Sequence, residues 1–276
     1  DVTVAVVDSG VPADFQQNPL LGTSLLGPPA VSSAPSEDEP WLYSGPVPVL
    51  VFPQGHGSFV AGVVRQAASG ASVRSYRALD TDGVTDEWYL GYQLALVLED
   101  APQVINLSLG TPTRADERLM GLAVLERAIT RSNTGERRPA PIVVAAAGNL
   151  GDSRPFYPAA DKWTISVGAV ELTGPDNDTP VPASFSNFGP WVDVCAKGAR
   201  VFSAYEHKPY RPLSAPSSII DFKGFALWNG TSFAAPHVSG VVAELLSRDP
   251  HLGLDGVRAI LEAGPVKVPN LGTYVQ

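Results

Sequence analysis

The chain has 276 residues, of which 44% are hydrophobic and 17% are charged, and its formal net charge is −9. This composition is that of a globular protein and excludes an intrinsically disordered chain. The acidic balance argues against a nucleic-acid partner, because it repels the phosphate backbone. No run of about 18 consecutive apolar residues occurs, so we expect no membrane span. A single cysteine, Cys195, excludes an internal disulfide.

Short apolar runs alternate with segments of helical periodicity along most of the chain. In chain order we predict a strand at 2–7, a mostly irregular stretch at 12–53 with one short strand at 47–52, a helix at 57–66, a strand at 73–78, a helix at 86–99, a strand at 104–109, a helix at 114–131 and a strand at 142–147. The second half continues with a strand at 164–170, turns at 175–182, short strands at 192–195 and 200–203, an irregular stretch at 206–224, and helices at 232–247 and 254–263. This alternation predicts one α/β domain over residues 1–276 with a mainly parallel sheet.

The sequence begins at Asp1, directly before a predicted strand, without an initiator methionine, signal peptide or pro-segment. Either a leader has been removed or the chain is one domain of something longer. In open α/β sheets, functional residues lie at the carboxyl ends of the strands. Those ends are therefore where we look for chemistry.

Three short segments contain the residue types that serine catalysis needs. Asp8 follows the first strand, His56 lies between two glycines, and Ser232 opens a helix after Gly-Thr. Each has an ordinary alternative, since Asp caps helices, a histidine in a turn is usually a surface residue, and Ser at a helix start is commonly an N-cap. Together they supply a nucleophile, a base that takes its proton, and a carboxylate that orients the base.

The surrounding blocks, Asp-Ser-Gly, Gly-His-Gly-Ser and Gly-Thr-Ser-Phe-Ala-Ala-Pro-His, resemble the three signatures of the subtilisin-like serine proteases, or subtilases. The chain order Asp, His, Ser is also that of subtilisin. The resemblance runs from Val4 to about Ala263. It implies a three-layer subtilisin-like fold with a mostly parallel twisted sheet and helices on both faces. It further implies a serine endopeptidase that hydrolyses peptide bonds through an acyl-enzyme, with Asp8, His56 and Ser232 as the catalytic triad.

The segment Ala145-Ala146-Ala147-Gly148-Asn149 resembles the one that carries the oxyanion-hole asparagine of the family. By that match, the Asn149 side-chain amide and the Ser232 main-chain N–H would stabilise the tetrahedral oxyanion. Without the resemblance, Asn149 is equally typical of a left-handed turn residue after a glycine.

The resemblance also implies the pocket for the substrate residue before the scissile bond. Its walls match Ser108-Leu109-Gly110 and Ala146-Ala147-Gly148, the first of which would also pair with an extended substrate backbone, and its floor matches Phe156. Relatives commonly have a small residue at the floor, so a phenyl ring predicts a shallow pocket. Leu150 on the rim offers no charge to a substrate Lys or Arg. We expect a preference for Ala, Val or Leu over Phe, Lys and Arg, unless Phe156 turns outward and leaves a roomy pocket.

We expect no metal ion and no cofactor. Many relatives bind calcium in a loop that interrupts the helix after the catalytic histidine, whereas here the predicted helix passes directly into residues 67–70. The nearest group of oxygen ligands is Asp176-Asn177-Asp178, and three such residues in a turn are more typical of turn chemistry.

Two alternatives stay open. The same triad could serve a specialised maturation protease or a peptide transferase, because hydrolysis and transfer share acylation and differ in the nucleophile that resolves the acyl-enzyme. A non-catalytic peptide-binding domain is the other, although all four key residues are present. The expected partner is a peptide or protein substrate, with a pro-segment or additional domain outside this chain, no nucleic acid, and a monomeric state. The resemblance favours a secreted or cell-surface location.

Overall fold

A ten-stranded sheet lies at the centre of the computed structural model, which describes residues 1–23, 25–27, 31–33, 49–50, 54–80, 82–131, 140–212, 215 and 217–276. The main path of the sheet runs through β16 (Lys267–Val268), β17 (Gly272–Tyr274), β11 (Val194–Lys197), β9 (Thr164–Thr173), β7 (Ile142–Ala146), β5 (Val104–Leu107), β1 (Thr3–Asp8), β4 (Ser72–Arg77) and β2 (Val31–Ser33), and β10 (Thr179–Pro182) pairs with β9. Neighbours from β2 to β17 are parallel, whereas β10 and β16 are antiparallel to their partners.

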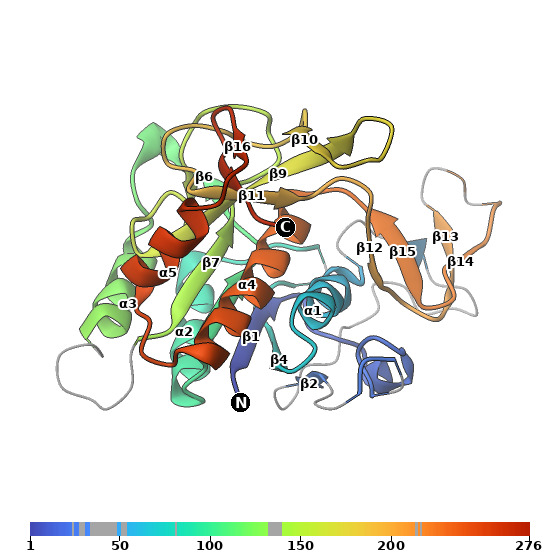
Figure 1. Ribbon diagram of the computed structural model, residues 1–276. Helices are drawn as coiled ribbons and strands as arrows, with labels where there is room; N and C mark the ends of the chain where they lie inside the picture. The colour runs from blue at the N-terminus through green and yellow to red at the C-terminus, as the bar shows by residue number, and fades with distance from the viewer. Residues whose placement is uncertain are drawn as a thin grey trace.

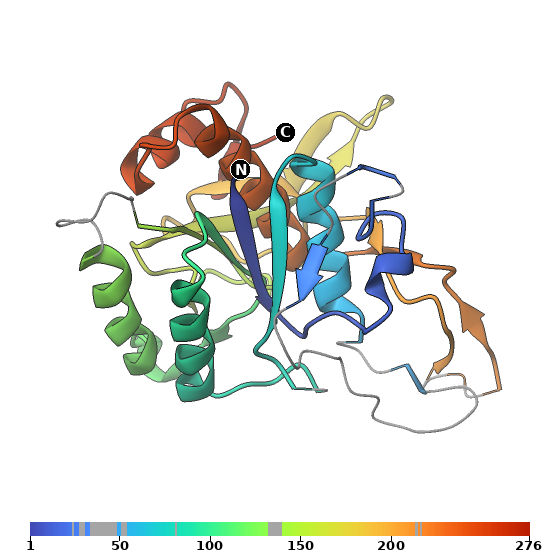
Figure 2. The ribbon, with the colours of Figure 1, turned by 90° about the horizontal axis from the view of Figure 1, so that it is seen from below.

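Helices cover both faces of this sheet, as Figures 1 and 2 show. One face carries α1 (His56–Ala67), α4 (Thr231–Arg248) and α5 (Leu254–Glu262), and the other carries α2 (Glu87–Glu99) and α3 (Met120–Arg131). The expected α/β class, with a mostly parallel sheet between helical layers, is therefore confirmed. None of the described helices has the length and hydropathy needed to cross a lipid bilayer.

β1 and β7 are largely apolar runs because both of their faces are covered. In β1, Val4 and Val6 join the hydrophobic core beneath α1 and α4, while Ala5 and Val7 join the core beneath α2 and α3. This alternation follows from the two-residue period of a strand, which sends successive side chains to opposite faces.

Short strands outside the main sheet pair with one another in small separate sheets. β12 (Val201–Ala204) pairs with β15 (Phe225–Trp228), β13 (Pro209–Pro212) pairs with β3 (Val49–Leu50) and β14 (Ile220–Asp221), and β6 (Thr111–Pro112) pairs with β8 (Phe156–Tyr157). Two short 3₁₀ helices, η1 (Phe15–Gln17) and η2 (Arg114–Asp116), lie in connecting segments.

Several sequence predictions are corrected by this structure. The helix predicted at 114–131 begins only at Met120, because Ala115 and Asp116 adopt positive φ angles of 59° and 57° that an α-helix does not allow. The turn-rich stretch 175–182 ends in β10, and the irregular stretch 206–224 contains β13 and β14. Of the strand predicted at 47–52, only Val49 and Leu50 lie among the described residues.

The parallel arrangement brings three chain segments together at one edge of the sheet. β1 ends at Asp8, β5 ends directly before Ser108, and β7 ends two residues before Gly148. Since β5 pairs with both β1 and β7, these carboxyl ends are neighbours in space. The edge is where the sequence analysis places its chemistry.

Candidate active site

Asp8 and His56 form the first pair of the site. Asp8 is fully buried at the end of β1, and its Oδ1 lies 2.7 Å from Nδ1 of His56. A carboxylate only accepts hydrogen bonds, so Nδ1 carries the proton and Nε2 remains an acceptor. The main-chain N–H of Ser9 donates to the same Oδ1 at 2.7 Å. The carboxylate is thus fixed in place, and it orients the imidazole as a base.

The glycines beside His56 are required by packing within the protein. A Cβ at Gly57 would lie 2.2 Å from the carbonyl oxygen of Gly10, and the N–H of Gly57 donates to Ser9 Oγ at 3.0 Å. Gly55 has a φ of +72°, and a Cβ there would lie 2.7 Å from the ring of Tyr205. The contact of Gly57 with Gly10 places the start of α1 against the end of β1. The contact of Gly55 places the same turn against Tyr205, the residue after β12.

Aromatic rings surround the imidazole on its other sides. The ring centroid of His56 lies 5.8 Å from that of Trp228 and 5.4 Å from that of Phe233. Phe59 contacts both of these rings, at 5.8 Å and 4.4 Å. The side chain of His56 is 13% exposed, so one edge of a largely enclosed imidazole reaches solvent.

Ser232 lies in the first turn of α4, and an internal proline shapes its surroundings. Pro236 has no N–H, so the carbonyl of Ser232 has no helical donor four residues later. Ser108 Oγ donates to that carbonyl instead, at 2.8 Å. In return, Ser232 Oγ donates to the carbonyl of Ser108 at 3.2 Å. The two serines therefore join the end of β5 to the start of α4.

A buried polar chain extends this junction into the core. Asn106 Nδ2 donates to Ser108 Oγ at 2.9 Å, and Ser239 Oγ lies 3.0 Å from Asn106 Oδ1. All three side chains are at most 4% exposed. Such satisfied networks fix a unique arrangement, so this one sets the position of α4 and of Ser232 against the sheet.

Asn149 follows β7 and is held by Thr231, the residue before Ser232. Asn149 Oδ1 accepts hydrogen bonds from the N–H of Thr231 at 2.8 Å and from its Oγ1 at 3.0 Å. Thr231 Oγ1 in turn accepts from the N–H of Gly148 at 3.0 Å. With its oxygen engaged in this way, the amide of Asn149 is free to present its two N–H donors to another acceptor.

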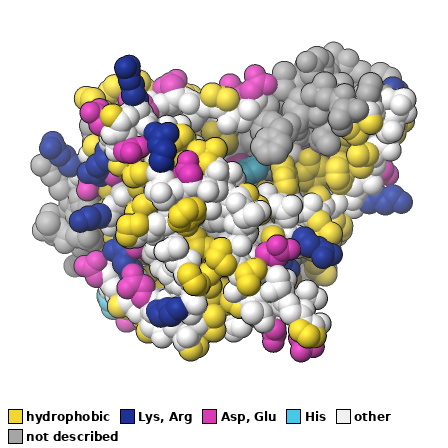
Figure 3. Space-filling model, turned by 90° about the horizontal axis from the view of Figure 1, so that it is seen from above, with side chains coloured by type: hydrophobic (Ala, Val, Ile, Leu, Met, Phe, Trp, Pro, Cys, Tyr) yellow, Lys and Arg dark blue, Asp and Glu magenta, His cyan; other side chains and the backbone are white. Residues whose placement is uncertain are grey.

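A cleft of about 560 Å³ opens over these residues. Its lining includes the predicted site residues His56, Ser108, Leu109, Gly110, Ala146, Gly148, Asn149, Phe156 and Ser232. Figure 3, which looks down on this end of the molecule, shows a histidine side chain set back between hydrophobic side chains. Of the other predicted residues, Asp8 lies buried behind His56, and Ala147 is buried in the core with its N–H bonded to the carbonyl of Val167.

The opposite wall of the cleft was missed by the sequence analysis. It is formed by the loop before α2 and the start of that helix, with three acidic side chains, Asp82, Asp86 and Glu87. Among the described residues, this lining contains three carboxylates and no Lys or Arg, an arrangement that favours positively charged groups in the cleft. Thr231, Asn106 and Ser239 were also missed. Only Thr231, inside the Gly-Thr-Ser block, carried a sequence signal that could have found it.

The ring of Phe156 lies between the two predicted walls of the pocket. A Cβ at Gly110 would come within 2.4 Å of its Cε1, and a Cβ at Gly148 would come within 2.8 Å of its Cγ. Leu150, which was expected on the rim, is 58% exposed but is not among the residues that line the cleft. The phenyl ring therefore packs directly against both glycines and does not turn outward.

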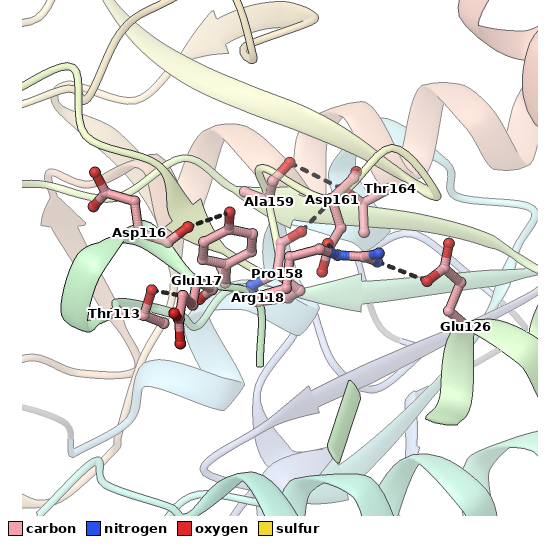
Figure 4. Close-up of polar contacts among 10 residues, drawn as sticks. Thr113, Asp116, Glu117, Arg118, Glu126, Pro158, Ala159, Asp161 and Thr164 are labelled. Carbon is pink, nitrogen blue, oxygen red and sulfur yellow. Dashed lines mark hydrogen bonds and ion pairs between the residues drawn. The ribbon is translucent and has the colours of Figure 1, made fainter. Parts of the chain in front are cut away.

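An ion-pair cluster holds the segment that follows Phe156, as Figure 4 shows. The Arg118 guanidinium bonds to the carboxylate of Asp161 and, at 2.7 Å, to Oε2 of Glu126. Tyr157 Oη donates to the carbonyl of Asp116 at 3.0 Å. The Asp161 side chain is only 2% exposed, and its burial raises the pKa of the carboxyl although Arg118 opposes this. The cluster ties the floor of the cleft to the segment before α3.

We expect Arg118→Ala to lower the free energy of unfolding by about 1–3 kcal/mol at pH 7, because a buried acceptor would lose its donor. Arg118 is half exposed, which keeps the loss below that of a wholly buried pair. Without Arg118 the folded-state pKa of Asp161 rises further above its unfolded value. The variant therefore regains stability as the pH falls below that folded-state pKa, where the carboxyl is neutral, and loses it as the pH rises.

Urea titrations at pH 4.5 and pH 7.5 measure this difference. Arg154→Ala is the matched control, since Arg154 pairs with Asp116 at 3.1 Å with both side chains about half exposed. Such a surface pair contributes at most about 1 kcal/mol. An equal deficit at both pH values in Arg118→Ala would contradict the role given to Asp161.

Two places for a metal ion were considered from the sequence, the connection after α1 and the segment Asp176–Asp178. α1 ends at Ala67 and β4 begins at Ser72, and the connection between them contains no acidic side chain. Asn177, in the Asp176–Asp178 segment, has a φ of +51° in the turn between β9 and β10, as expected for turn chemistry. Nowhere in the described part of the chain do three or more His, Cys, Asp or Glu side chains gather as metal ligands would.

Comparison with known proteins agrees with this geometry. A model of the subtilase family matches residues 1–264. A thermophilic serine proteinase of Bacillus sp. (strain AK1) is 31% identical over 98% of this chain and 58% of its own length. Thermitase of Thermoactinomyces vulgaris is 31% identical over 80% of this chain and 70% of its own length. Subtilisin E of Bacillus subtilis (strain 168) is 29% identical over 99% of this chain and 63% of its own length.

The same fold is found among solved structures. A cold-adapted subtilisin-like serine proteinase superposes with a TM-score of 0.68 at 23% identity, covering 99% of this chain and 86% of that one. The chain thus spans roughly three fifths to seven tenths of the length of the three named sequence relatives. Since the family model covers almost the whole sequence, the chain belongs to the subtilase family of subtilisin-like serine peptidases.

Proposed function

We propose that this chain forms one peptidase domain that hydrolyses peptide bonds inside polypeptides through an acyl-enzyme on Ser232. His56 acts as the general base and acid, Asp8 holds its tautomer, and Asn149 with the main-chain N–H of Ser232 binds the oxyanion. The observation that carries the proposal is the 2.7 Å contact between Asp8 Oδ1 and His56 Nδ1, in a cleft that His56 and Ser232 both line.

The reaction follows from this arrangement. Ser232 Oγ attacks the substrate carbonyl while Nε2 of His56 takes its proton, and the tetrahedral oxyanion forms beside Asn149. His56 then gives the proton to the leaving amine, and the acyl-enzyme remains. Water, deprotonated by His56, attacks the acyl group, and His56 then returns the proton to the departing Ser232 oxygen, which releases the carboxylic acid product and restores the enzyme. The Ser232 hydroxyl donates to the carbonyl of Ser108 here, and catalytic hydrogen bonds commonly align only when substrate is bound.

Covalent labelling tests the proposal directly. A peptidyl diphenyl phosphonate should modify the folded chain once, with the adduct mapped to Ser232 by peptide mass spectrometry, because only an activated serine attacks phosphorus. Ser232→Ala should not be labelled. Ser247→Ala, at the exposed end of the same helix, is the control and should be labelled like the parent. A folded parent chain that stays unlabelled would count against an activated serine and in favour of a non-catalytic domain.

We also propose that Phe156 limits the substrate residue before the scissile bond to small or medium apolar side chains. What supports this is the position of the ring between Gly110 and Gly148, where a substrate side chain would enter. The exposed Leu150, which was expected on the rim, offers no counter-charge to Lys or Arg.

For Phe156→Gly we expect the ratio of kcat/KM for substrates with Phe before the cut to those with Ala to rise about tenfold or more, since removing the ring opens volume for several carbon atoms. Cleavage-site profiling on a denatured proteome, with kinetics on matched peptides, measures the ratio. Phe202→Ala, which removes a half-exposed ring of β12 outside the cleft lining, should leave it unchanged. If parent and Phe156→Gly cleave after Phe and Tyr equally well, Phe156 does not set the pocket.

A further inference from the structure

We infer that Asn187 is a positioning residue for the oxyanion hole, acting through Asn149. This inference rests on the proposed role of Asn149 and extends it to a residue that lies outside the triad, outside the signature blocks and outside the cleft lining. Asn187 is fully buried in the segment between β10 and β11.

Asn187 binds the backbone on both sides of Asn149. Its Oδ1 accepts from the N–H of Leu150 at 2.8 Å, and its own N–H donates to the carbonyl of Gly148 at 2.9 Å. Asn149 is therefore the exposed middle residue of a three-residue segment whose two neighbours are held by one buried side chain and its backbone. Thr231 holds the Asn149 side chain, and Asn187 holds the backbone that carries it.

Steric packing adds to these hydrogen bonds. A Cβ at Gly148 would lie 2.5 Å from Nδ2 of Asn187, so the amide lies directly against the backbone of Gly148. Gly148 itself has a φ of +100°, a conformation that only glycine adopts readily. The turn from β7 into Asn149 thus depends on an unusual backbone conformation that the Asn187 side chain abuts.

The Asn187 amide is retained at a cost. Its Nδ2 is buried and has no hydrogen-bond partner among the described residues, and an unsatisfied buried donor destabilises the fold. A serine or alanine would avoid that cost but would not supply an acceptor at the distance of the Leu150 N–H. The amide oxygen, with its contact to Leu150, is therefore the part of the side chain that serves the site.

The test is a double-mutant cycle in kcat between Asn187→Ala and Asn149→Ala, measured on one peptide substrate. Asn187→Ala alone should lower kcat by about 10- to 100-fold with KM little changed, because a small displacement of Asn149 weakens contacts made only in the transition state. In the Asn149→Ala background the same substitution should lower kcat less than threefold, since the group it positions is gone.

Asn18→Ala is the matched control, because Asn18 is another buried amide that binds backbone groups, here the carbonyls of Tyr205 and Gly224. Its effect on kcat should be the same factor in both backgrounds. If Asn187→Ala also changes kcat by equal factors in both backgrounds, or leaves kcat unchanged, the inference is overturned. The proposed role of Asn149 requires that Asn149→Ala alone lowers kcat. If it does not, that role fails, and this failure is distinguished from a failure of the inference about Asn187.

A second measurement separates positioning from general weakening of the fold. A peptide aldehyde forms a hemiacetal with Ser232 whose oxygen occupies the oxyanion site, whereas the corresponding peptide alcohol does not. Asn187→Ala should raise the inhibition constant of the peptide aldehyde by the same factor by which it lowers kcat. It should leave the inhibition constant of the peptide alcohol unchanged. If Asn187→Ala does not fold, the inhibition constants of the aldehyde and the alcohol are compared in the same way for Asn187→Ser. An equal rise in the inhibition constants of both compounds would overturn the inference.

Discussion

Replacing Ser232 or His56 with alanine is expected to abolish turnover while the fold remains intact. For subtilisin itself, loss of either the serine or the histidine costs on the order of 10⁶ in turnover, and we take that value over for this relative. The reason is that the nucleophile and its base act as one unit, so that removing either leaves only the oxyanion hole and substrate binding. Initial rates on a chromogenic peptide, with active-site titration of the parent, measure the loss.

Two controls make this result specific. The melting temperature of Ser232→Ala should stay within a few degrees of the parent, because the Ser232 side chain donates one hydrogen bond within the described part of the chain, to the carbonyl of Ser108. His56→Ala should lose more stability, because it removes the donor to the buried carboxylate of Asp8. Ser247→Ala, which removes a hydroxyl bonded only within the last turn of α4, should retain full activity. Near-full activity in purified Ser232→Ala would refute the assignment of the nucleophile.

Replacing Asn149 is expected to produce the second-largest effect. In subtilisin, removal of the oxyanion asparagine costs about 10²–10³ in kcat, and a similar loss is expected here. Asn149 is exposed to the cleft and its oxygen is already engaged by Thr231, so the amide N–H groups face the substrate. The expected signature is a fall in kcat with little change in KM, since the developing oxyanion is absent in the ground state.

Asn149→Asp separates loss of the donor from loss of structure. The aspartate keeps an oxygen that can accept both hydrogen bonds from Thr231, but it places a carboxylate where the oxyanion develops. We expect Asn149→Asp to be at least as impaired as Asn149→Ala, despite its preserved contacts. If Asn149→Asp were instead close to the parent, Asn149 would serve the turn after β7 and not the oxyanion.

The parts of the fold that the sequence predicted are those with their own local pattern. β1, β5 and β7 were found because strands covered on both faces are short apolar runs that end in polar or glycine residues. The α3 boundary was wrong because positive φ angles at Ala115 and Asp116 leave no mark on hydrophobic periodicity. Short strands such as β10, β13 and β16 exist through their pairing partners, and prolines within two of them argue against a strand when read locally.

The residues of the site also divide into those that lie in a recognisable local sequence pattern and those that do not. Asp8, His56 and Ser232 were predicted from the sequence because they lie in blocks whose residue types are tied to one chemistry. Residues that position those groups carry no such signal, because Asn187 and Ser239 are ordinary polar residues until the chain folds. The acidic wall at Asp82–Glu87 was missed for a related reason. Charges before a helix are typical of N-caps, and Asp86 does cap α2 through the N–H groups of Trp88 and Tyr89.

The place of α4 in the chain has a consequence for when activity arises. Asp8 and His56 come from the first quarter of the sequence, whereas the helix that carries Ser232 packs against α1, β5, β7 and β9 and comes near its end. During synthesis, a growing polypeptide holds Asp8 and His56 long before it holds Ser232. On the sheet face that α1, α4 and α5 cover, only α1 is available before α4 has left the ribosome. Contacts between such distant segments form late and slowly. A nascent chain therefore cannot assemble the proposed triad until α4 has been made and has packed on the sheet.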